Sequence, residues 1–375
     1  MYLPPFELER WFARYEFNVK FNLCASCAGA SNTAELLELA GPGSTDTYLG
    51  LNLDYIPSEG SQRLREAVSD MYTSLSSENI RITTGASEAI FLLMNSLLEP
   101  GDEVIVQYPI YQSLFSLAES MGCRVSCWRG EFADNFVPRL DALETLLTPR
   151  TKIVIINTPH SPTGMVFETE MLQAIVEMVG QNGALLVSDE VYRGLFLGLG
   201  PEPPAAADLS SSAVSIGDLT KPFGLGGLRV GWIASGNTGI LERCAVLRDY
   251  TTMCCAAPSE FLAVTALENR DFLLKNKKAA AERNLKLLSN FVDQNQAALE
   301  WVSPLGGVSA FPRLDLPVSA REFCTALVEE KSVLLLPGDV FGFPQHFRIG
   351  FGAEPGAFAE GLAAVGEFLQ ESFRS

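Results

Sequence analysis

The amino-acid sequence predicts an α/β protein built around a largely parallel sheet. Between about residues 80 and 235, short apolar runs alternate with helix-like segments. Apolar runs without polar interruption are typical of strands that helices bury on both faces. The predicted strands are 103–108, 151–157, 184–189 and 212–218, and the helices between them include 87–98 and 169–180.

The remainder of the chain has a different pattern. Residues 237–300 are mostly helical in pattern, and after about residue 305 strands alternate with helices at 319–330 and 355–371. This pattern predicts a smaller α+β domain that the N-terminal arm completes. We expect an N-terminal arm shared with the small domain (1–45), a large domain (46–268) and a small C-terminal domain (269–375).

Composition excludes several classes of partner. The 375 residues are 47% hydrophobic and 19% charged, which is typical of a globular protein. The formal net charge of −18 argues against nucleic acid, because phosphate binding needs a basic patch. The first residues lack the pattern of a signal peptide, and no apolar run approaches the roughly 18–20 residues of a membrane helix. We therefore expect a cytoplasmic protein with no membrane partner.

Cysteines and histidines do not predict a metal site. The chain has eight cysteines and two histidines. Cys24 and Cys27 form a CxxC pair, but no second pair and no nearby histidine completes a zinc set. We expect reduced thiols and no metal.

Polar side chains follow the predicted strands, and ligands of such sheets bind beyond the carboxyl ends of the strands. Gly85, Ala86 and Ser87 begin a helix, where free amides and the helix dipole favour an anion. The same three residues also suit a simple N-cap. Tyr111 lies beyond the next strand, where its ring suits either stacking on a planar ligand or core packing.

The next strand ends provide further polar groups. Asn157 and Ser161 lie in the rigid turn "NTPHSPTG". Asp189 ends an apolar run, where an unpaired carboxylate is unfavourable and needs a cationic or hydrogen-donating partner. Tyr192 is near enough in sequence to reach the same ligand.

Lys221 and Arg229 flank the glycine-rich loop "KPFGLGGLR", which is an unusual place for a solvated lysine. One ligand suits all the groups at these successive strand ends: the anion cradle, the stacking ring, the buried carboxylate, the lysine and the arginine. That ligand is a planar, cationic, phosphorylated aldehyde, namely pyridoxal 5'-phosphate. The glycine-rich segments do not match GxGxxG between a strand and a helix, so a dinucleotide is not predicted.

Taken together, these motifs resemble those of a known family. The fragments "GASEA", "NTPHSPTG", "SDEVYR", "DLTKPFGLGGLRVGW" and "FRIGF" follow the order and spacing of the class I/II aminotransferases, which are pyridoxal-phosphate enzymes of fold type I. The resemblance extends over nearly the whole chain. It implies a mostly parallel seven-stranded sheet flanked by helices, with a smaller C-terminal α+β domain.

The resemblance assigns the residues that act on the cofactor ring. It implies that Lys221 forms the internal aldimine and later moves the substrate α-proton. Asp189 would pair with the pyridinium nitrogen, Tyr192 would hydrogen-bond the phenolic oxygen, and Tyr111 would stack on the ring. Asn157 belongs to the same cofactor-binding set.

The remaining assignments concern the two anionic groups. Gly85, Ala86, Ser87 and Arg229 would hold the cofactor phosphate, and Arg348 would grip the substrate α-carboxylate as a bidentate fork. Tyr55 resembles the tyrosine that reaches the phosphate of the neighbouring subunit, which implies a homodimer. An ordinary packed tyrosine is the other interpretation of Tyr55.

Two positions depart from the family pattern. Ser161 replaces the usual asparagine, so we expect a weaker hold on the cofactor phenolate and an altered aldimine pKa. Asp218 stands where many relatives have a phosphate-binding serine. Because an aspartate would repel phosphate, we expect Asp218 to point elsewhere and Thr220 to supply the hydroxyl.

The reaction is less determined than the cofactor. The segments "PPFELERWFARYEF", "LRDYTTMCC" and "GGVSAFPRL" resemble the branch that forms capreomycidine and enduracididine, which implies elimination and cyclisation of a hydroxylated arginine through an external aldimine and a quinonoid. Glu7, Glu9 and Glu16 are candidate guanidinium partners, or solvated surface residues. An aminotransferase that uses 2-oxoglutarate is the main alternative, and an arginine oxidase and a transcriptional regulator are remote ones.

Overall fold

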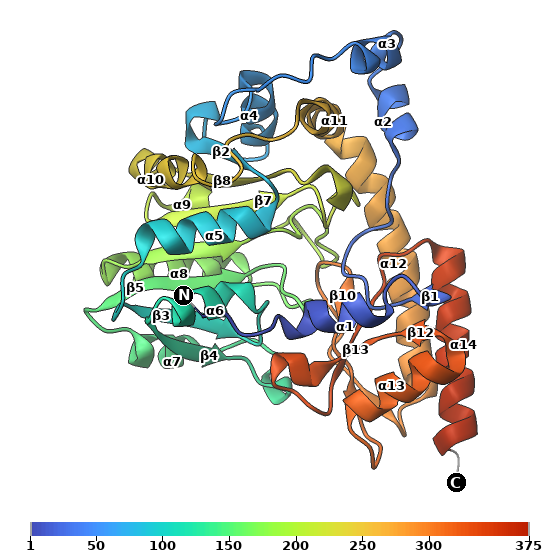
Figure 1. Cartoon of the computed structure of the whole chain (residues 1–375). Coiled ribbons are helices and arrows are strands. Elements are labelled where there is room, and N and C mark those ends of the chain that lie inside the picture. The colour runs from blue at the N-terminus through green and yellow to red at the C-terminus, as the bar shows by residue number, and fades with distance from the viewer. Residues whose placement is uncertain (1, 374–375) are drawn as a thin grey trace.

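The computed structural model describes residues 2–373 and is organised around a seven-stranded sheet (Figure 1). The strand order is β2-β8-β7-β6-β5-β3-β4. All pairs are parallel except those of β8, which runs antiparallel to both β2 and β7. The predicted α/β fold is therefore confirmed. The strands are β2 (Ile80–Thr83), β3 (Glu103–Tyr108), β4 (Arg124–Arg129), β5 (Thr151–Asn157), β6 (Leu185–Asp189), β7 (Ala213–Asp218) and β8 (Gly231–Ser235).

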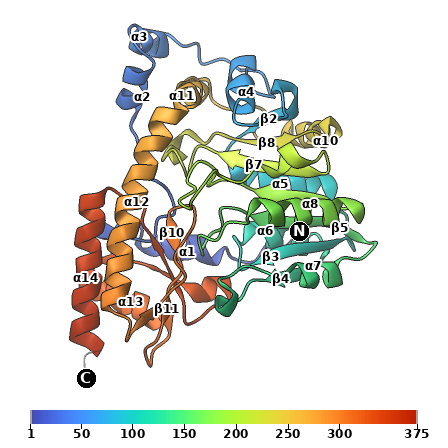
Figure 2. The same ribbon diagram turned by 180° about the vertical axis from the view of Figure 1, so that it is seen from behind.

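Helices cover both faces of this sheet, as the opposite views in Figures 1 and 2 show. In β5, Ile153 and Ile155 belong to one buried apolar cluster while Val154 and Ile156 belong to another. Burial on both faces explains why the strand sequence has no polar alternation. The helices around the sheet are α5 (Ala86–Leu97), α6 (Ser113–Ser120), α7 (Leu140–Leu146), α8 (Thr169–Gln181), α9 (Ala206–Leu209) and α10 (Thr238–Arg248).

The long helix α12 (Arg270–Gln294) runs from the large sheet to the C-terminal elements (Figure 1). The predicted helical region thus consists of α10, α11 (Ala257–Glu268) and α12. The C-terminal elements are β9 (Leu299–Glu300), β10 (Ser309–Ala310), β11 (Arg313–Leu314), α13 (Ala320–Lys331), β12 (Val333–Leu334), β13 (Leu336–Pro337), β14 (Phe347–Gly350) and α14 (Pro355–Phe373).

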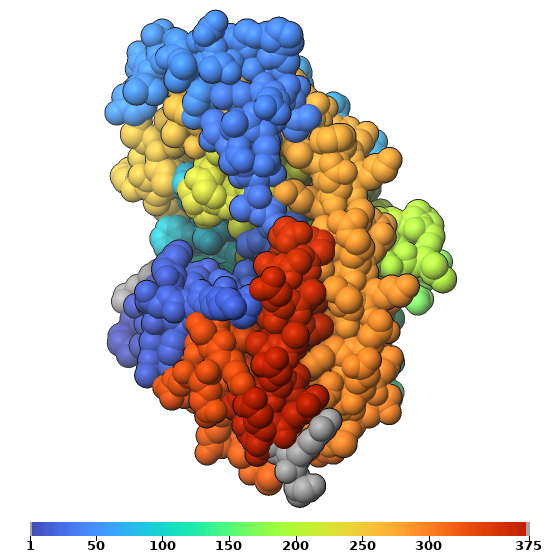
Figure 3. Space-filling model, turned by 90° about the vertical axis from the view of Figure 1, so that its right-hand side faces the viewer, coloured from blue at the N-terminus to red at the C-terminus, as the bar shows by residue number. Residues whose placement is uncertain are grey.

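The N-terminal arm packs against the C-terminal elements, as Figure 3 shows by the contact of blue and red segments. Strand β1 (Phe21–Asn22) pairs in parallel with β12, and the Trp11 indole donates to the carbonyl of Leu335 over 2.9 Å. The arm begins with α1 (Glu7–Tyr15) and continues to α2 (Thr33–Leu39). Helices α3 (Ser44–Leu49) and α4 (Gln62–Ser69) follow it. The domain boundaries at 45 and 268 stay predictions.

Short 3-10 turns complete the secondary structure, at Ser77–Asn79, Phe132–Asp134, Gly226–Leu228 and Gly338–Phe341. Among residues 2–373, no helix combines the length and the apolar character that crossing a membrane requires.

Candidate active site

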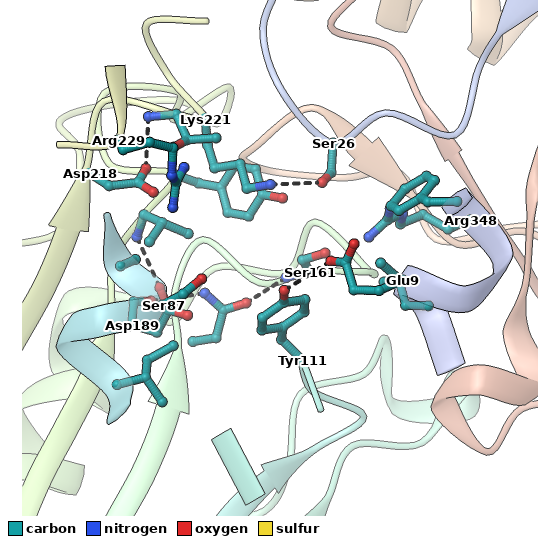
Figure 4. A pocket seen from close by; sticks show the side chains of 18 residues that line it. Glu9, Ser26, Ser87, Tyr111, Ser161, Asp189, Asp218, Lys221, Arg229 and Arg348 are labelled. Carbon is teal, nitrogen blue, oxygen red and sulfur yellow. Dashed lines mark hydrogen bonds between the residues drawn. The ribbon is translucent and has the colours of Figure 1, made fainter. Parts of the chain in front are cut away.

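A cavity of about 270 Å³ lies beyond the carboxyl ends of β5, β6 and β7. Figure 4 shows Lys221, Arg229 and Asp218 on one side of it and Arg348 and Glu9 on the other. Eleven of the thirteen predicted site residues line this cavity: Ala86, Ser87, Tyr111, Asn157, Ser161, Asp189, Tyr192, Thr220, Lys221, Arg229 and Arg348. The topology therefore brings together residues from across the chain, as the strand-end argument predicts.

Lys221 follows β7 and directs its amine into the cavity. The Nζ donates to Ser26 Oγ over 3.2 Å and lies 3.7 Å from Cys27 Sγ. Desolvation opposes a charge at this amine, but Cys27, Tyr192 and Asp218 together raise the pKa of Lys221 above its ordinary value. The amine thus has polar partners on the arm side and a carboxylate on the sheet side.

Asp189 ends β6 and is buried, with 4% of its surface exposed. Its Oδ1 accepts from the Val191 backbone N–H over 3.1 Å, and among the described residues no lysine or arginine nitrogen lies within 4 Å. Burial raises the pKa of Asp189 from 3.8 to about 7. Such a carboxyl is poised to ionise when a cation is placed beside it.

The Asp189→Asn variant is expected to stabilise the cofactor-free chain more at pH 8 than at pH 5. The native pKa of about 7 exceeds the unfolded value of 3.8, so the stability from the protonated carboxyl is complete below about pH 4 and is lost as the pH rises through 7. The amide of asparagine does not titrate, so its contribution to the stability of the folded chain does not change over this pH range. Melting temperatures at the two pH values check this, with exposed Asp293→Asn as the control. A pH-independent difference would contradict it.

An anion cradle lies at the N-terminus of α5. Ala86 and Ser87 form its first turn, and the preceding Gly85 adopts a φ of 78°. A Cβ at Gly85 would collide with Arg229 Nη2, so only glycine lets the guanidinium lie against this turn. The helix N-terminus and Arg229 together create a positive site beside the cavity. Gly85 itself does not line the cavity but leaves room for Arg229, and its predicted role in holding the cofactor phosphate stays a prediction.

Asn157 braces the loop between β5 and α8. Its Nδ2 donates to the carbonyl of Asp189 over 2.8 Å, and its Oδ1 accepts from the Ser161 N–H over 2.7 Å. The amide group therefore links two strand ends of the site. Ser161 lines the cavity and is 9% exposed. The predicted weaker contact of Ser161 with the cofactor stays a prediction.

Arg348 lies in β14 and is only 2% exposed. Its Nη2 donates to the carbonyl of Cys24 over 3.0 Å, while its Nε has no partner. Phe12 and Phe341 flank the guanidinium, each ring centroid at 5.9 Å. Among residues 2–373, no carboxylate lies within 4 Å of it. A buried guanidinium without a counter-charge is unfavourable unless a ligand supplies the anion.

Asp218 also lines the cavity, where it is 5% exposed. The expectation that it points away from the cofactor phosphate stays a prediction. Its Oδ1 accepts from the Thr220 backbone N–H over 2.9 Å, and burial raises its pKa. A local turn at the end of β7 holds the carboxyl toward the cavity.

Tyr55 does not line the cavity of its own chain and is 79% exposed. Its predicted contact with a neighbouring subunit stays a prediction.

The sequence reasoning missed five lining residues: Leu8, Phe12, Ser26, Ile90 and Val191. Leu8, Glu9 and Phe12 come from α1, which lies across the cavity. Leu8 and Phe12 are apolar and four residues apart, so they share one face of the helix, and this spacing indicates a buried face. Of the three candidate glutamates, only Glu9 reaches the cavity; it accepts from the Tyr111 hydroxyl over 3.2 Å. Ser26 lies in a loop, where no periodicity marks it.

The cavity therefore offers an amine, a buried carboxyl without a cation and an anion cradle to one ligand. Pyridoxal phosphate has an aldehyde, a basic ring nitrogen and a phosphate, and fits all three. The fold and this set of groups define a pyridoxal-phosphate-dependent enzyme.

Comparison with known proteins gives the family. The sequence profile described as "Aminotransferase class I and II" matches residues 49–365, and the chain belongs to that family. It is 32% identical to capreomycidine synthase of Streptomyces vinaceus over 98% of this chain and 94% of that protein. It is 30% identical to aspartate aminotransferase of Thermotoga maritima over 84% of this chain and 83% of that protein.

Two solved structures have the same fold over essentially their whole length. A pyridoxal-phosphate-dependent aminotransferase from Streptococcus suis superposes with a TM-score of 0.95 at 30% identity, covering 100% of both chains. The pyridoxal-phosphate-dependent cyclase OrfR superposes with a TM-score of 0.92 at 31% identity, covering 99% of this chain and 98% of that one.

Proposed function

We propose that this enzyme eliminates water from a hydroxylated arginine and closes the guanidine into a ring, which yields a cyclic guanidine amino acid. Two similarities support this reaction: the match to capreomycidine synthase over 98% of the chain and the match to a cyclase structure. The observation that carries the proposal is the presence of two groups of opposite charge, Arg348 and Glu9, in the outer part of the cavity, on the side away from Lys221. Arg348 suits an α-carboxylate, and Glu9 suits a cationic side chain.

In this proposal the cofactor lies in the inner part of the cavity, on the side of Lys221 and Arg229. Lys221 would form the covalent link, Asp189 would keep the pyridine nitrogen protonated, and Tyr192 would donate to the phenolic oxygen. Bound in this way, pyridoxal phosphate supplies a ring that accepts the electron pair left at the substrate α-carbon. Ser87 and Arg229 would bind the phosphate together with the first amides of α5.

The protein groups would then control protons and orientation. Arg348 fixes the α-carboxylate, and the Lys221 amine removes the α-proton. The side-chain hydroxyl leaves as water, a guanidine nitrogen adds to the unsaturated carbon, and Lys221 returns a proton to the α-carbon. The net change is the loss of one water, so no keto acid is consumed.

Glu9 is the acidic group of the outer cavity that α1 provides. The Tyr111 hydroxyl holds its carboxylate at 3.2 Å, and Leu8 and Phe12 provide apolar surface beside it. In such a partly desolvated site a guanidinium pairs with a carboxylate through two parallel hydrogen bonds.

An aminotransferase is the second candidate, and the match to aspartate aminotransferase favours it. The two candidates differ in one requirement. A transaminase needs a keto acid and converts 2-oxoglutarate to glutamate, whereas the cyclase needs no acceptor.

Mass spectrometry of products distinguishes the candidates. The enzyme is incubated with arginine, 3-hydroxyarginine, 4-hydroxyarginine and common amino acids, with and without 2-oxoglutarate. The proposal expects loss of one water from a hydroxyarginine without an acceptor. Glutamate formation that tracks 2-oxoglutarate would establish the transaminase instead.

The Glu9→Gln variant is expected to raise KM for the guanidine substrate by about 10- to 100-fold, as expected for a lost charge-assisted hydrogen bond. Binding of amino acids with a neutral side chain should change little. Glu7→Gln is the matched control, because Glu7 is exposed two residues away on the same helix. Equal effects of the two variants would contradict a role of Glu9 in recognition.

We also propose that the active unit is a homodimer in the cytoplasm. Leu49, Leu53 and Tyr55 are 76%, 85% and 79% exposed within one short segment, which suits burial against a second copy. In that dimer Tyr55 would reach the cofactor phosphate of the partner.

A further inference from the structure

We propose that Ser26 positions the Lys221 amine for proton transfer. This inference rests on the proposed role of Lys221 as the residue that moves the α-proton. Ser26 is 7% exposed and lines the cavity, and its Oγ accepts from Lys221 Nζ over 3.2 Å. The two residues are 195 positions apart, so the contact is a product of the fold.

Ser26 belongs to a segment, residues 23–31, that we call the strap. On one side the strap is tied to the lysine loop, because the Ala28 N–H donates to the carbonyl of Lys221 over 2.8 Å. On the other side it is tied to β14, because the Gly350 N–H donates to the carbonyl of Leu23 over 2.7 Å. Backbone bonds on both sides thus fix the position of Ser26.

Side chains and close packing hold the strap further. Arg348 donates to the carbonyl of Cys24, and Lys277 of α12 donates to the carbonyl of Gly29 over 2.6 Å. A Cβ at Gly350 would collide with the carbonyl of Ala25. The strap therefore has little room to move, which is what a positioning residue requires.

The contact has a direct consequence for the amine. A lysine side chain has four rotatable bonds, and a fixed acceptor restricts where its nitrogen rests. Ser26 Oγ accepts a hydrogen bond from the amine, which favours the ammonium form. This contribution adds to the effect of Cys27, Tyr192 and Asp218, which raise the pKa of Lys221. The strap also contacts Arg348, so one short segment orients both the amine and the guanidinium.

Cys27 is the weaker neighbour of the amine. Its sulfur lies at 3.7 Å against 3.2 Å for Ser26 Oγ, and a thiol is a poor acceptor. We therefore assign the positioning role to the hydroxyl.

Three variants test the assignment: Ser26→Ala, Ser26→Thr and, as a control on the same strap, Ser31→Ala. For Ser26→Ala, kcat of the holoenzyme should fall about 10- to 100-fold with little change in KM. This fall corresponds to the free energy of one hydrogen bond to a charged group. The acid limb of the kcat–pH profile should move to lower pH by about one unit, because the amine loses an acceptor.

A second readout does not depend on turnover. The full-length chain freed of cofactor is labelled with acetic anhydride at a series of pH values, and acetylation of Lys221 is followed by peptide mass spectrometry. The labelling midpoint should fall by about one pH unit in Ser26→Ala, recover in Ser26→Thr and stay unchanged in Ser31→Ala.

Unchanged profiles and midpoints in Ser26→Ala would overturn the inference. So would an equal loss in Ser26→Thr, because that variant retains the hydroxyl. Failure of the premise, the role of Lys221, is seen separately: the wild-type holoenzyme, reduced with borohydride, would then show no cofactor on Lys221. Failure of the cyclase proposal is seen in the products, as glutamate formation that tracks 2-oxoglutarate.

Discussion

Replacing Lys221 by alanine is expected to lower turnover by about 10⁴-fold, the upper end of what a positioned acid–base group contributes. The reason is that one residue would serve as both the covalent attachment point and the proton carrier. Its amine lines the cavity with Asp218, Thr220 and Tyr192 around it, and the described part of the lining contains no second lysine. No neighbouring amine is therefore placed to replace it.

The measurement has a chemical and a kinetic part. The holoenzyme is reduced with borohydride, digested and examined by mass spectrometry; the cofactor should be found on the peptide that contains Lys221. The exposed Lys275→Ala variant is the control and should keep wild-type turnover and the same label. Label on another residue, or turnover retained in Lys221→Ala, would contradict the assignment.

Replacing Arg348 by methionine is expected to lower kcat/KM by about 10²- to 10³-fold. Methionine removes the bidentate donor to a substrate carboxylate, and breaking a buried charge pair costs about 2–5 kcal/mol. Arg348→Lys should recover only part of the loss, because an ammonium cannot form the planar fork.

The same variant should not lose stability, which separates this effect from misfolding. Arg348 is 2% exposed and has an unpartnered Nε, so the folded chain already bears a poorly compensated charge. Removing that charge is expected to leave the melting temperature of the cofactor-free chain equal or higher.

Thermal unfolding and steady-state kinetics are measured on Arg348→Met together with Arg10→Met, an exposed arginine on α1 that does not line the cavity. A normal kcat/KM in Arg348→Met would contradict its role in binding the carboxylate.

Much of the inner site could be predicted from sequence because sheet topology constrains it. Parallel strands such as β5 and β6 are buried on both faces and read as unbroken apolar runs, so their ends are visible in the sequence. Asn157 and Asp189 are the last residues of these two strands. Since parallel strands end on one edge, their polar terminal residues had to converge.

The outer site could not be predicted in this way. Glu9 reaches the cavity while Glu7 and Glu16 do not, because α1 turns one face toward it. The direction of that face depends on packing such as the bond from Trp11 to Leu335.

The sequence by itself determined the parallel sheet, the polar residues at its strand ends and hence the pyridoxal-phosphate chemistry, because hydrophobic periodicity and strand-end position are local properties. Only the tertiary structure decided which residues of the arm face the cavity and that Ser26 meets Lys221. Those contacts join segments 195 to 324 residues apart, through hydrogen bonds and close packing that no local pattern encodes.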